Sequence, residues 1–233
     1  MIRTVGETGS TNDDLAVLAR EGAPEGLWLR AERQTGGRGR QGRGWHSAHG
    51  NLYASTLVRL APGDPPAPSL AMVAAVALHE VVSAFAPGHK ALIKWPNDLL
   101  VDGAKLSGIL LQRAHDSVVI GIGVNLASAP EGLDRPVTSL ARLTGSAPDP
   151  AVFLETLADS FARWLSRWRG QGLAPVRDRW LLAAHPVGTA LTTDAAGQRL
   201  EGLFDGLDAS GSLRLRLADG GVHVIHAGDV FLI

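Results

Sequence analysis

Four stretches of the chain have the capping residues and the apolar spacing of α-helices. The run Gly-Ser-Thr-Asn predicts a helix that starts near Asn12. Ser69 is a suitable N-cap for an apolar helix over 69–86, and Asp149 followed by proline predicts the start of a third helix. A fourth helix is expected over about 175–184. The third helix carries one apolar stripe, which we assign to the core: Phe153, Leu154, Leu157, Phe161, Trp164, Leu165 and Trp168.

Shorter stretches alternate between apolar and polar residues, or are continuously apolar, and predict β-strands. Asp102 and Gly103 separate two such stretches, which is a strong signal for a β-hairpin. The region from 91 to 126 therefore predicts a β-meander. The predicted strands are 26–31, 51–60, 91–95, 98–101, 105–112 and 117–126.

The C-terminal stretch, 185–233, changes character to short alternating strands. Turns with the sequences Asp-Ala-Ala-Gly (194–197), Asp-Ala-Ser-Gly (208–211) and Asp-Gly-Gly (219–221) separate them and predict a small β-barrel. About 49 residues without a disulfide or metal are marginally stable alone, so we expect this unit to pack against the rest. The sequence thus divides into a larger N-terminal domain, 1–184, and a C-terminal domain, 185–233.

Charge and composition exclude several classes of function. A formal net charge of -1 provides no broad basic surface for phosphate neutralisation, so we expect no nucleic-acid partner. The absence of cysteine excludes disulfides, thiolate metal sites and a thiol nucleophile. The longest apolar runs, such as 71–78, are too short to span a membrane. We therefore expect a cytoplasmic protein without a membrane partner.

The most unusual feature is the loop 37–43, which reads Gly-Arg-Gly-Arg-Gln-Gly-Arg. Its glycines exclude regular structure and let a ligand approach the backbone closely. Its guanidinium groups suit carboxylate and phosphate oxygens. It is not a P-loop, because the Gly-Lys-Ser/Thr ending is missing. The alternative is a flexible Arg-Gly tract that binds RNA loosely.

Lysine is scarce in this sequence, and two of its three lysines lie close together. Lys90, Lys94 and Lys105 are the lysines among 22 basic residues. Lys94 opens the run Lys-Trp-Pro-Asn-Asp, and Lys105 follows across the predicted hairpin turn. Because arginine is used elsewhere, these positions indicate sites that need a compact ammonium charge, as at an anionic reaction centre. The alternative is chance survival of two surface lysines, and Asn97 and Asp98 alone could be turn residues.

The predicted strand 117–126 has one apolar face and one nearly bare face. Val119, Gly121, Gly123 and Asn125 share the second face. The two glycines leave room for a flat ligand against the sheet, with Asn125 at its edge to hydrogen-bond a heterocycle. The alternative is a glycine-weakened strand beneath a crossing helix.

Together these features resemble the catalytic domain of the biotin protein ligases. Ser10-Thr-Asn, Gln34, the Arg-Gly loop, Lys-Trp-Pro-Asn-Asp, Lys-x-x-Gly-Ile-Leu and Gly-Ile-Gly-x-Asn occur in the family's order over about 5–184. The resemblance implies an α+β fold: a mixed β-sheet with flanking helices, as in class II aminoacyl-tRNA synthetases, plus a C-terminal SH3-like β-barrel. Larger members carry an N-terminal helix-turn-helix domain, for which we expect no room before Ser10.

The resemblance also implies roles for individual residues. Asp98 would orient the lysines or magnesium, Trp45 would cover the adenine, and Asn125 would lie near the base. We therefore expect Arg40, Lys105 and Asn125 to surround one cavity. The implied catalytic residues are Lys105, Arg40, Lys94 and Asp98; the biotin-binding residues are Ser10, Thr11, Asn12, Gln34, Gly37, Arg38, Gly39, Arg40, Lys105, Gly108, Gly121 and Gly123; the ATP-binding residues are Arg40, Arg43, Trp45, Lys94, Asn97, Lys105 and Asn125.

The implied reaction has two steps. The carboxylate of biotin attacks the α-phosphate of ATP and releases pyrophosphate, and then an acceptor lysine attacks the mixed anhydride. Mg²⁺ would be bridged through the ATP phosphates near Asp98, without a metal site made by the protein alone. The implied partner is a biotin carboxyl carrier protein or domain of a biotin-dependent carboxylase, and an edge-to-edge homodimer is left open. The alternatives are a lipoate or octanoate ligase on a related fold and a non-catalytic biotin sensor.

Overall fold

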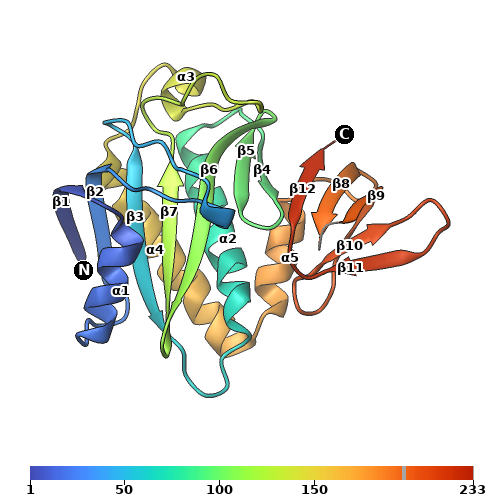
Figure 1. Cartoon of the computed structure of the whole chain (residues 1–233), viewed down its shortest axis with the longest axis horizontal. Coiled ribbons are helices and arrows are strands. Elements are labelled where there is room, and N and C mark those ends of the chain that lie inside the picture. Colours follow the sequence, from blue (N-terminus) through green and yellow to red (C-terminus); the bar gives the residue numbers. More distant parts are fainter. Residues whose placement is uncertain (196–197, 233) are drawn as a thin grey trace.

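A seven-stranded mixed sheet forms the centre of the molecule, and the C-terminal stretch adds a second sheet at its side (Figure 1). The computed structural model describes residues 1–195 and 198–232. The large sheet has the strand order β1-β2-β3-β7-β6-β5-β4, in which β1 and β2 pair in parallel and the other neighbours pair antiparallel. Its strands are β1 Ile2–Thr8, β2 Trp28–Gln34, β3 Leu52–Arg59, β4 Ala91–Lys94, β5 Asp98–Val101, β6 Ala104–Ala114 and β7 Ser117–Val124.

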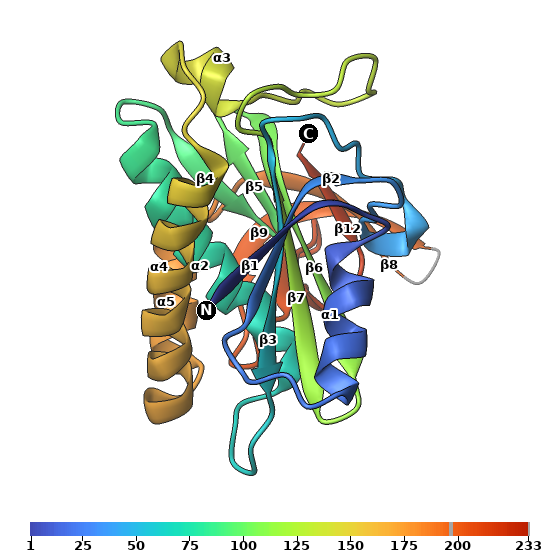
Figure 2. The same cartoon turned by 90° about the vertical axis from the view of Figure 1, so that its left-hand side faces the viewer.

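Helices cover both faces of this sheet. Figure 2 shows α1 on one face and α2, α4 and α5 on the other. Ser10 occupies the N-cap position of the first helix without a capping hydrogen bond from its side chain. The fourth helix is capped by Asp149, whose carboxylate accepts the Ala151 N–H at 2.6 Å. The helices are α1 Thr11–Arg20, α2 Leu70–Phe85, α3 Leu140–Thr144, α4 Pro150–Gln171 and α5 Ala174–Leu182, with 3₁₀ turns η1 Arg40–Gly42 and η2 Ala67–Ser69.

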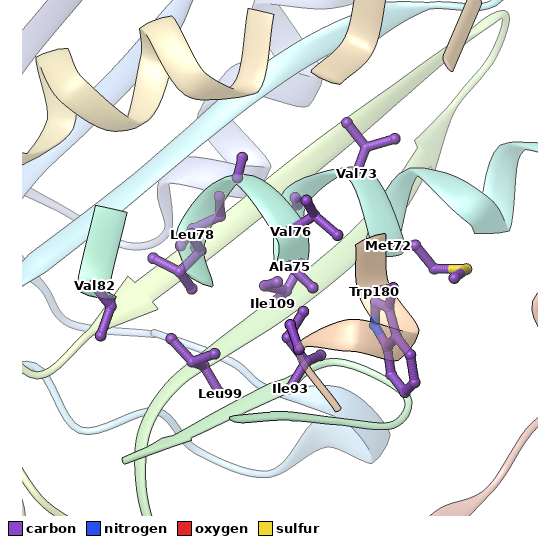
Figure 3. Close-up of a cluster of buried hydrophobic side chains, with 14 of the residues drawn as sticks. Met72, Val73, Ala75, Val76, Leu78, Val82, Ile93, Leu99, Ile109 and Trp180 are labelled. Carbon is purple, nitrogen blue, oxygen red and sulfur yellow. The ribbon is translucent and has the colours of Figure 1, made fainter. Parts of the chain in front are cut away.

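The main core lies between α2 and the sheet. Figure 3 shows Ala75 and Leu78 of α2 beside Ile93, Leu99 and Ile109, which come from three successive strands and are almost fully buried. Burying each large side chain of this kind stabilises the fold by roughly 1.5–3 kcal/mol. The segment Ala67–Phe85 is apolar and long enough to cross a membrane, but 67% of its most apolar window is buried inside the structure, as in the core helix of a globular protein.

The C-terminal stretch folds into an antiparallel five-stranded sheet rather than the predicted barrel. Its order is β11-β10-β9-β8-β12, so in the described part of the chain the sheet is open, with β11 and β12 at its ends. It packs against the large domain, where Trp95 Nε1 donates to Gly211 O at 3.2 Å. The predicted turn at 194–197 extends into residues 196–197, which lie outside the described residues. The strands are β8 Ala190–Ala195, β9 Gln198–Leu207, β10 Leu213–Arg216, β11 Val222–Ile225 and β12 Asp229–Leu232.

The predicted α+β class is confirmed, and the meander over 91–126 forms as β4 to β7. Two elements are absent from the sequence-based prediction. The edge strand β1 is mostly exposed, so it lacks the apolar alternation that marks half-buried strands. The helix α3 is only five residues long, too short for a periodic signal.

Candidate active site

One cavity of about 90 Å³ lies over the glycine-bearing face of β6 and β7, beneath the Arg-Gly loop and beside the start of α1. It collects residues from most of the segments that sequence analysis singled out. Arg40 and Lys105, expected to share a cavity, both line it. The residues around it are Ser10, Thr11, Asn12, Gln34, Arg38, Gly39, Arg40, Arg43, Gly44, Trp45, Tyr53, Ala54, Asn97, Asp98, Lys105, Gly108, Ile109, Leu110, Gly121, Ile122, Gly123, Arg135 and Asp229.

A chain of buried polar groups forms one end of the cavity. The Thr11 N–H donates to Gln34 Oε1 at 2.8 Å, and the hydroxyls of Thr11 and Ser55 are 2.7 Å apart. Ser55 Oγ donates to Asn12 Oδ1 at 2.6 Å. The Thr11 hydroxyl also lies 3.0 Å from Gln34 Oε1. With the Ser55 proton directed to Asn12, the single Thr11 hydroxyl proton has two acceptors within reach, Gln34 Oε1 and Ser55 Oγ. The network thus fixes the orientation of the Asn12 and Gln34 amides, which suits recognition of a polar ligand with its own donors and acceptors.

Side chains of the chain itself cover the two glycines of β7. A Cβ on Gly121 would lie 2.2 Å from Asn12 Oδ1, and a Cβ on Gly123 would lie 2.6 Å from the Trp45 ring. The Trp45 ring also contacts Gly108, where a Cβ would be 3.1 Å away. The glycines therefore provide space for Asn12 and Trp45 against the sheet. The space expected for a flat ligand above Gly123 is occupied by the flat ring of Trp45.

Lys105 and Asp98 form an ion pair inside the cavity. Lys105 Nζ donates to Asp98 Oδ1 at 2.5 Å, and both side chains are largely buried, 12% and 14% exposed. Burial lowers the pKa of Lys105 from its ordinary value, although Asp98 acts in the opposite direction. Lys105 also lies 5.7 Å from the centre of the Trp45 ring. This arrangement fixes an ammonium group in a partly desolvated site, where its charge acts strongly on an anion.

Lys94 lies outside the cavity lining. Its Nζ is 5.6 Å from the centre of the Phe231 ring of β12. Burial lowers the pKa of Lys94, while the carboxylates of Asp98 and Asp229 raise it. Lys94 is therefore a neighbour of the cationic site that faces the C-terminal sheet.

The Arg-Gly loop is fastened to the C-terminal sheet through Asp229. Arg40 Nη1 donates to Gly228 O at 3.1 Å and lies 3.5 Å from Asp229 Oδ1, and Arg43 pairs with the other oxygen of the same carboxylate. Asn97 Oδ1 lies 3.5 Å from Arg40 Nη1, so the loop also contacts the Trp-Pro-Asn-Asp turn. One carboxylate from the second sheet thus lies between two guanidinium groups at the mouth of the cavity.

Two other residues of the Arg-Gly loop, Arg38 and Gly37, do not contact the C-terminal sheet through Asp229. Arg38 pairs with Asp13 on the first turn of α1, and both side chains are about half exposed. Gly37 does not line the cavity; its carbonyl accepts the Trp45 N–H at 2.9 Å, and a Cβ there would lie 2.8 Å from Trp45 O. Gly37 therefore allows the two strands of the loop to approach each other.

Asn125 does not surround the cavity with Arg40 and Lys105, contrary to expectation. Its side chain is buried, and Nδ2 donates to Thr138 O at 3.1 Å. Its backbone carbonyl accepts the Leu140 N–H at 3.0 Å. The amide is used to hold the segment after β7 in place, so it is not free at the edge of a ligand shelf.

Sequence reasoning missed several residues at this site. Ser55 lies beside Thr56 between apolar residues of β3, and these two polar residues within a largely apolar stretch are the signal that could have indicated it. Asp229 lies in the C-terminal stretch, 186 residues after Arg43, and no local pattern links them. Arg135 is one of many arginines, and only the tertiary structure places it at the cavity.

Within residues 1–195 and 198–232, no group of three or more His, Cys, Asp or Glu side chains is arranged to hold a metal ion. Asp98 already accepts a hydrogen bond from Lys105. The residues present therefore fit a magnesium ion only as one carried by substrate phosphates, which is how Mg²⁺ is often bound.

The fold and the cavity define a class of protein: an α+β protein with a mixed sheet and a pocket lined by more cationic than anionic side chains. Residues 8–125 match the biotin/lipoate A/B protein ligase family, and residues 190–233 match the biotin protein ligase C-terminal domain. The chain belongs to the biotin protein ligase family.

Known relatives of this family are similar along almost the whole chain. The biotin–(acetyl-CoA-carboxylase) ligase of Paracoccus denitrificans is 39% identical, over 96% of this chain and 97% of the relative. The enzyme of the same name from Mycobacterium tuberculosis is 37% identical, over 97% of this chain and 86% of the relative. The structure of the biotin protein ligase from Aquifex aeolicus in complex with biotin and ATP superposes with a TM-score of 0.89 at 24% identity, covering 100% of this chain and 99% of that one.

Proposed function

We propose that this chain forms biotinyl-5'-AMP from biotin and ATP and transfers biotin to a lysine of a biotin carboxyl carrier domain. The observation that carries the proposal is the convergence of Arg40 and the Lys105–Asp98 pair on the cavity that the Thr11–Asn12 network closes. The names of the two bacterial relatives support a carboxylase as the source of the acceptor. We also propose a cytoplasmic location and the division into domains 1–184 and 185–233.

The buried polar network is the proposed site for the ureido ring of biotin. Ser10, Thr11, Asn12 and Gln34 present fixed donors and acceptors to a ring that has both. The proposed site for the carboxylate is the loop of Arg38, Gly39 and Arg40. In this proposal Gly37 positions the loop, and Gly121 gives Asn12 the space to reach the ligand. Gly108 and Gly123 would form the surface beneath the ligand after Trp45 moves away from them.

The proposed nucleotide site uses the cationic side chains that lie beyond the carboxylate of bound biotin. Three cationic side chains of the cavity lining would face the phosphates: Arg40, Arg43 and Lys105. Lys94, which lies outside the lining, would add to the positive electrostatic potential at the site. Trp45 would move away from the glycines of the sheet to cover the adenine. Asn97 would hold the Arg-Gly loop in position through its contact with Arg40. Asn125 would act by holding the segment beside the base. Mg²⁺, carried by the phosphates near Asp98, would neutralise part of their charge.

Catalysis in this site needs positioning and charge stabilisation rather than a protein nucleophile. Attack of the carboxylate on the α-phosphate concentrates negative charge on phosphate oxygens, and Lys105 is held in a partly desolvated position that suits this charge. In the second step the amine of the acceptor lysine attacks the activated carbonyl, and AMP leaves. Arg40 would stabilise the negative charge that develops in this second step.

The Arg-Gly loop is proposed to act as a lid over the adenylate. In the structure two of its three arginines, Arg40 and Arg43, are held by Asp229, which lies where phosphates would compete for them. We expect trypsin to cleave after Arg38, Arg40 and Arg43 more slowly when biotin and ATP are both present. The matched variant Asp229→Asn should be cleaved faster than the native protein without ligands. Equal cleavage with and without ligands would contradict the lid.

Biotin-dependent exchange of pyrophosphate into ATP tests the proposed activity. We expect exchange with biotin and none with lipoate, because the Arg-Gly loop and the ureido-site network are built for biotin. Exchange with lipoate alone would support a lipoate ligase, and the absence of exchange with either acid, despite biotin binding, would support a non-catalytic sensor. Size-exclusion chromatography with and without biotin and ATP would detect the edge-to-edge homodimer that the exposed strand β1 permits.

A further inference from the structure

Arg135 lies at the cavity mouth without a part in the site predicted from sequence. It belongs to the segment between β7 and α3, which passes over the end of β6 where Lys105 lies (Figure 1). Its side chain is exposed and lines the cavity together with Lys105. Among the described residues no carboxylate pairs with Arg135, whereas Arg40 and Arg43 pair with Asp229, and Lys105 pairs with Asp98.

The backbone beside Arg135 is fixed relative to Lys105. The Lys105 N–H donates to Pro136 O at 2.9 Å, and the Thr138 N–H donates to Lys105 O at 2.9 Å. Lys105 and Val137 therefore form an isolated parallel bridge. Arg135 lies in a bend two residues before Val137 and lines the cavity together with Lys105.

The cavity carries more positive than negative charge. Its lining has five cationic side chains, Arg38, Arg40, Arg43, Lys105 and Arg135, and two carboxylates, Asp98 and Asp229. Burial is the main cause that lowers the pKa values of Lys94 and Lys105, and the positive charge of Arg135 lowers both further. Like charges gathered around one cavity are costly unless an anion binds between them.

We propose that Arg135 is a phosphate-binding residue of the nucleotide site, which contacts the β- and γ-phosphates and later the departing pyrophosphate. A guanidinium group suits this role because it offers several donors in a fixed fork and retains its charge at any physiological pH. Exposure at the mouth suits the outer phosphates, which must leave as pyrophosphate, while the buried Lys105 lies deeper. This inference rests on the proposed function, in which ATP occupies the cavity.

The test compares Arg135→Gln and Arg135→Lys with Arg142→Gln, a matched change of an exposed arginine on α3. The readouts are ATP binding by calorimetry and the KM values for ATP, pyrophosphate and biotin in the exchange reaction. We expect Arg135→Gln to raise the KM values for ATP and pyrophosphate about five- to tenfold, as for loss of one charge-assisted contact, with the KM for biotin unchanged. Arg135→Lys should recover part of the affinity, and Arg142→Gln should behave as the native protein.

The alkaline limb of the exchange activity gives a second readout that a structural role would not change. Lys105 is faced by Asp98, Lys94 and Arg135, so removal of one positive charge should raise its pKa and shift the limb of Arg135→Gln to higher pH. Native ATP binding and an unshifted limb in Arg135→Gln, or equal changes in Arg142→Gln, would overturn the inference. Failure of the native protein to bind ATP would overturn the proposed function itself, and the inference with it.

Discussion

Lys105 and Asp98 face each other across the β5–β6 hairpin, with Lys105 Nζ donating to Asp98 Oδ1 at 2.5 Å. The two strands pair Asp98 with Gly108 rather than with Lys105, and a shift in register between Leu99 and Leu100 accompanies the pairing of Leu100 with Lys105. Gly108 has no side chain to separate them, and a Cβ there would lie 3.4 Å from Lys105 Nζ. The hairpin thus positions one ammonium group at the centre of the proposed reaction site.

Lys105→Ala should lose most of the adenylate-forming activity and keep the fold. Removal of a preorganised charge from a partly desolvated site costs about 10²–10³-fold in rate, as measured for single oxyanion donors. The measurement is the biotin-dependent pyrophosphate exchange rate, together with circular dichroism of the folded protein. Lys90→Ala, which removes an exposed lysine outside the cavity, is the control and should retain native activity. An exchange rate of Lys105→Ala near the native value would contradict the assigned role.

The exchange activity should fall at alkaline pH before an ordinary lysine would lose its proton. Burial lowers the pKa of Lys105, so its folded-state pKa lies below the unfolded value of 10.5. The charged form that binds an anion is therefore lost as pH rises through the lowered value. Asp98→Asn removes the carboxylate that raises this pKa and should shift the alkaline limb further down. An Asp98→Asn profile that moves to higher pH would argue against a working Lys105–Asp98 pair.

Gly121→Ala should destabilise the protein and weaken biotin binding together. The new methyl group would overlap Asn12 Oδ1, so either α1 or the Asn12 side chain must shift. Such overpacking typically costs about 1–3 kcal/mol. Thermal unfolding and the KM for biotin measure the two effects. Gly6→Ala, where a Cβ meets nothing within 4 Å, is the matched glycine control and should change neither quantity.

Stability should fall in acid where the Glu25 carboxylate becomes protonated. Arg169 Nη1 and Nη2 donate to the two oxygens of Glu25 at 2.5 and 2.8 Å and hold the pKa of Glu25 below its ordinary value of 4.5. Because the folded-state pKa is depressed, the contribution is present above pH 4.5 and is lost as pH falls through the lowered pKa.

Glu25→Gln should therefore reduce the free energy of unfolding at pH 7 by about 1 kcal/mol, a value reduced for the partial exposure of both side chains. The difference between the variant and the native protein should shrink at pH 3. Urea unfolding at the two pH values measures it. A difference that stays constant with pH would show that the ion pair does not contribute through its charge.

The sequence alone determined the local elements and the chemical character of the site. The apolar periodicity of 69–86 and 150–171 and the turn at Asp102-Gly103 depend on neighbours in the chain, so α2, α4 and the β5–β6 hairpin follow from them. The scarcity of lysine likewise indicated Lys105 before its surroundings were known. The two glycines of β7 indicated a close approach to the sheet, although not which group makes it.

Only the tertiary structure decided which distant groups share the cavity. Trp45 and Asn12 fill the space above the glycines, Asp229 holds Arg40 and Arg43, and the Asn125 amide serves the backbone of Thr138. These contacts join segments up to 189 positions apart, as between Arg40 and Asp229. A contact of that kind depends on how sheets and loops pack, which no local pattern of residues encodes. The open edge of the second sheet is decided in the same way, because pairing between its end strands is not local.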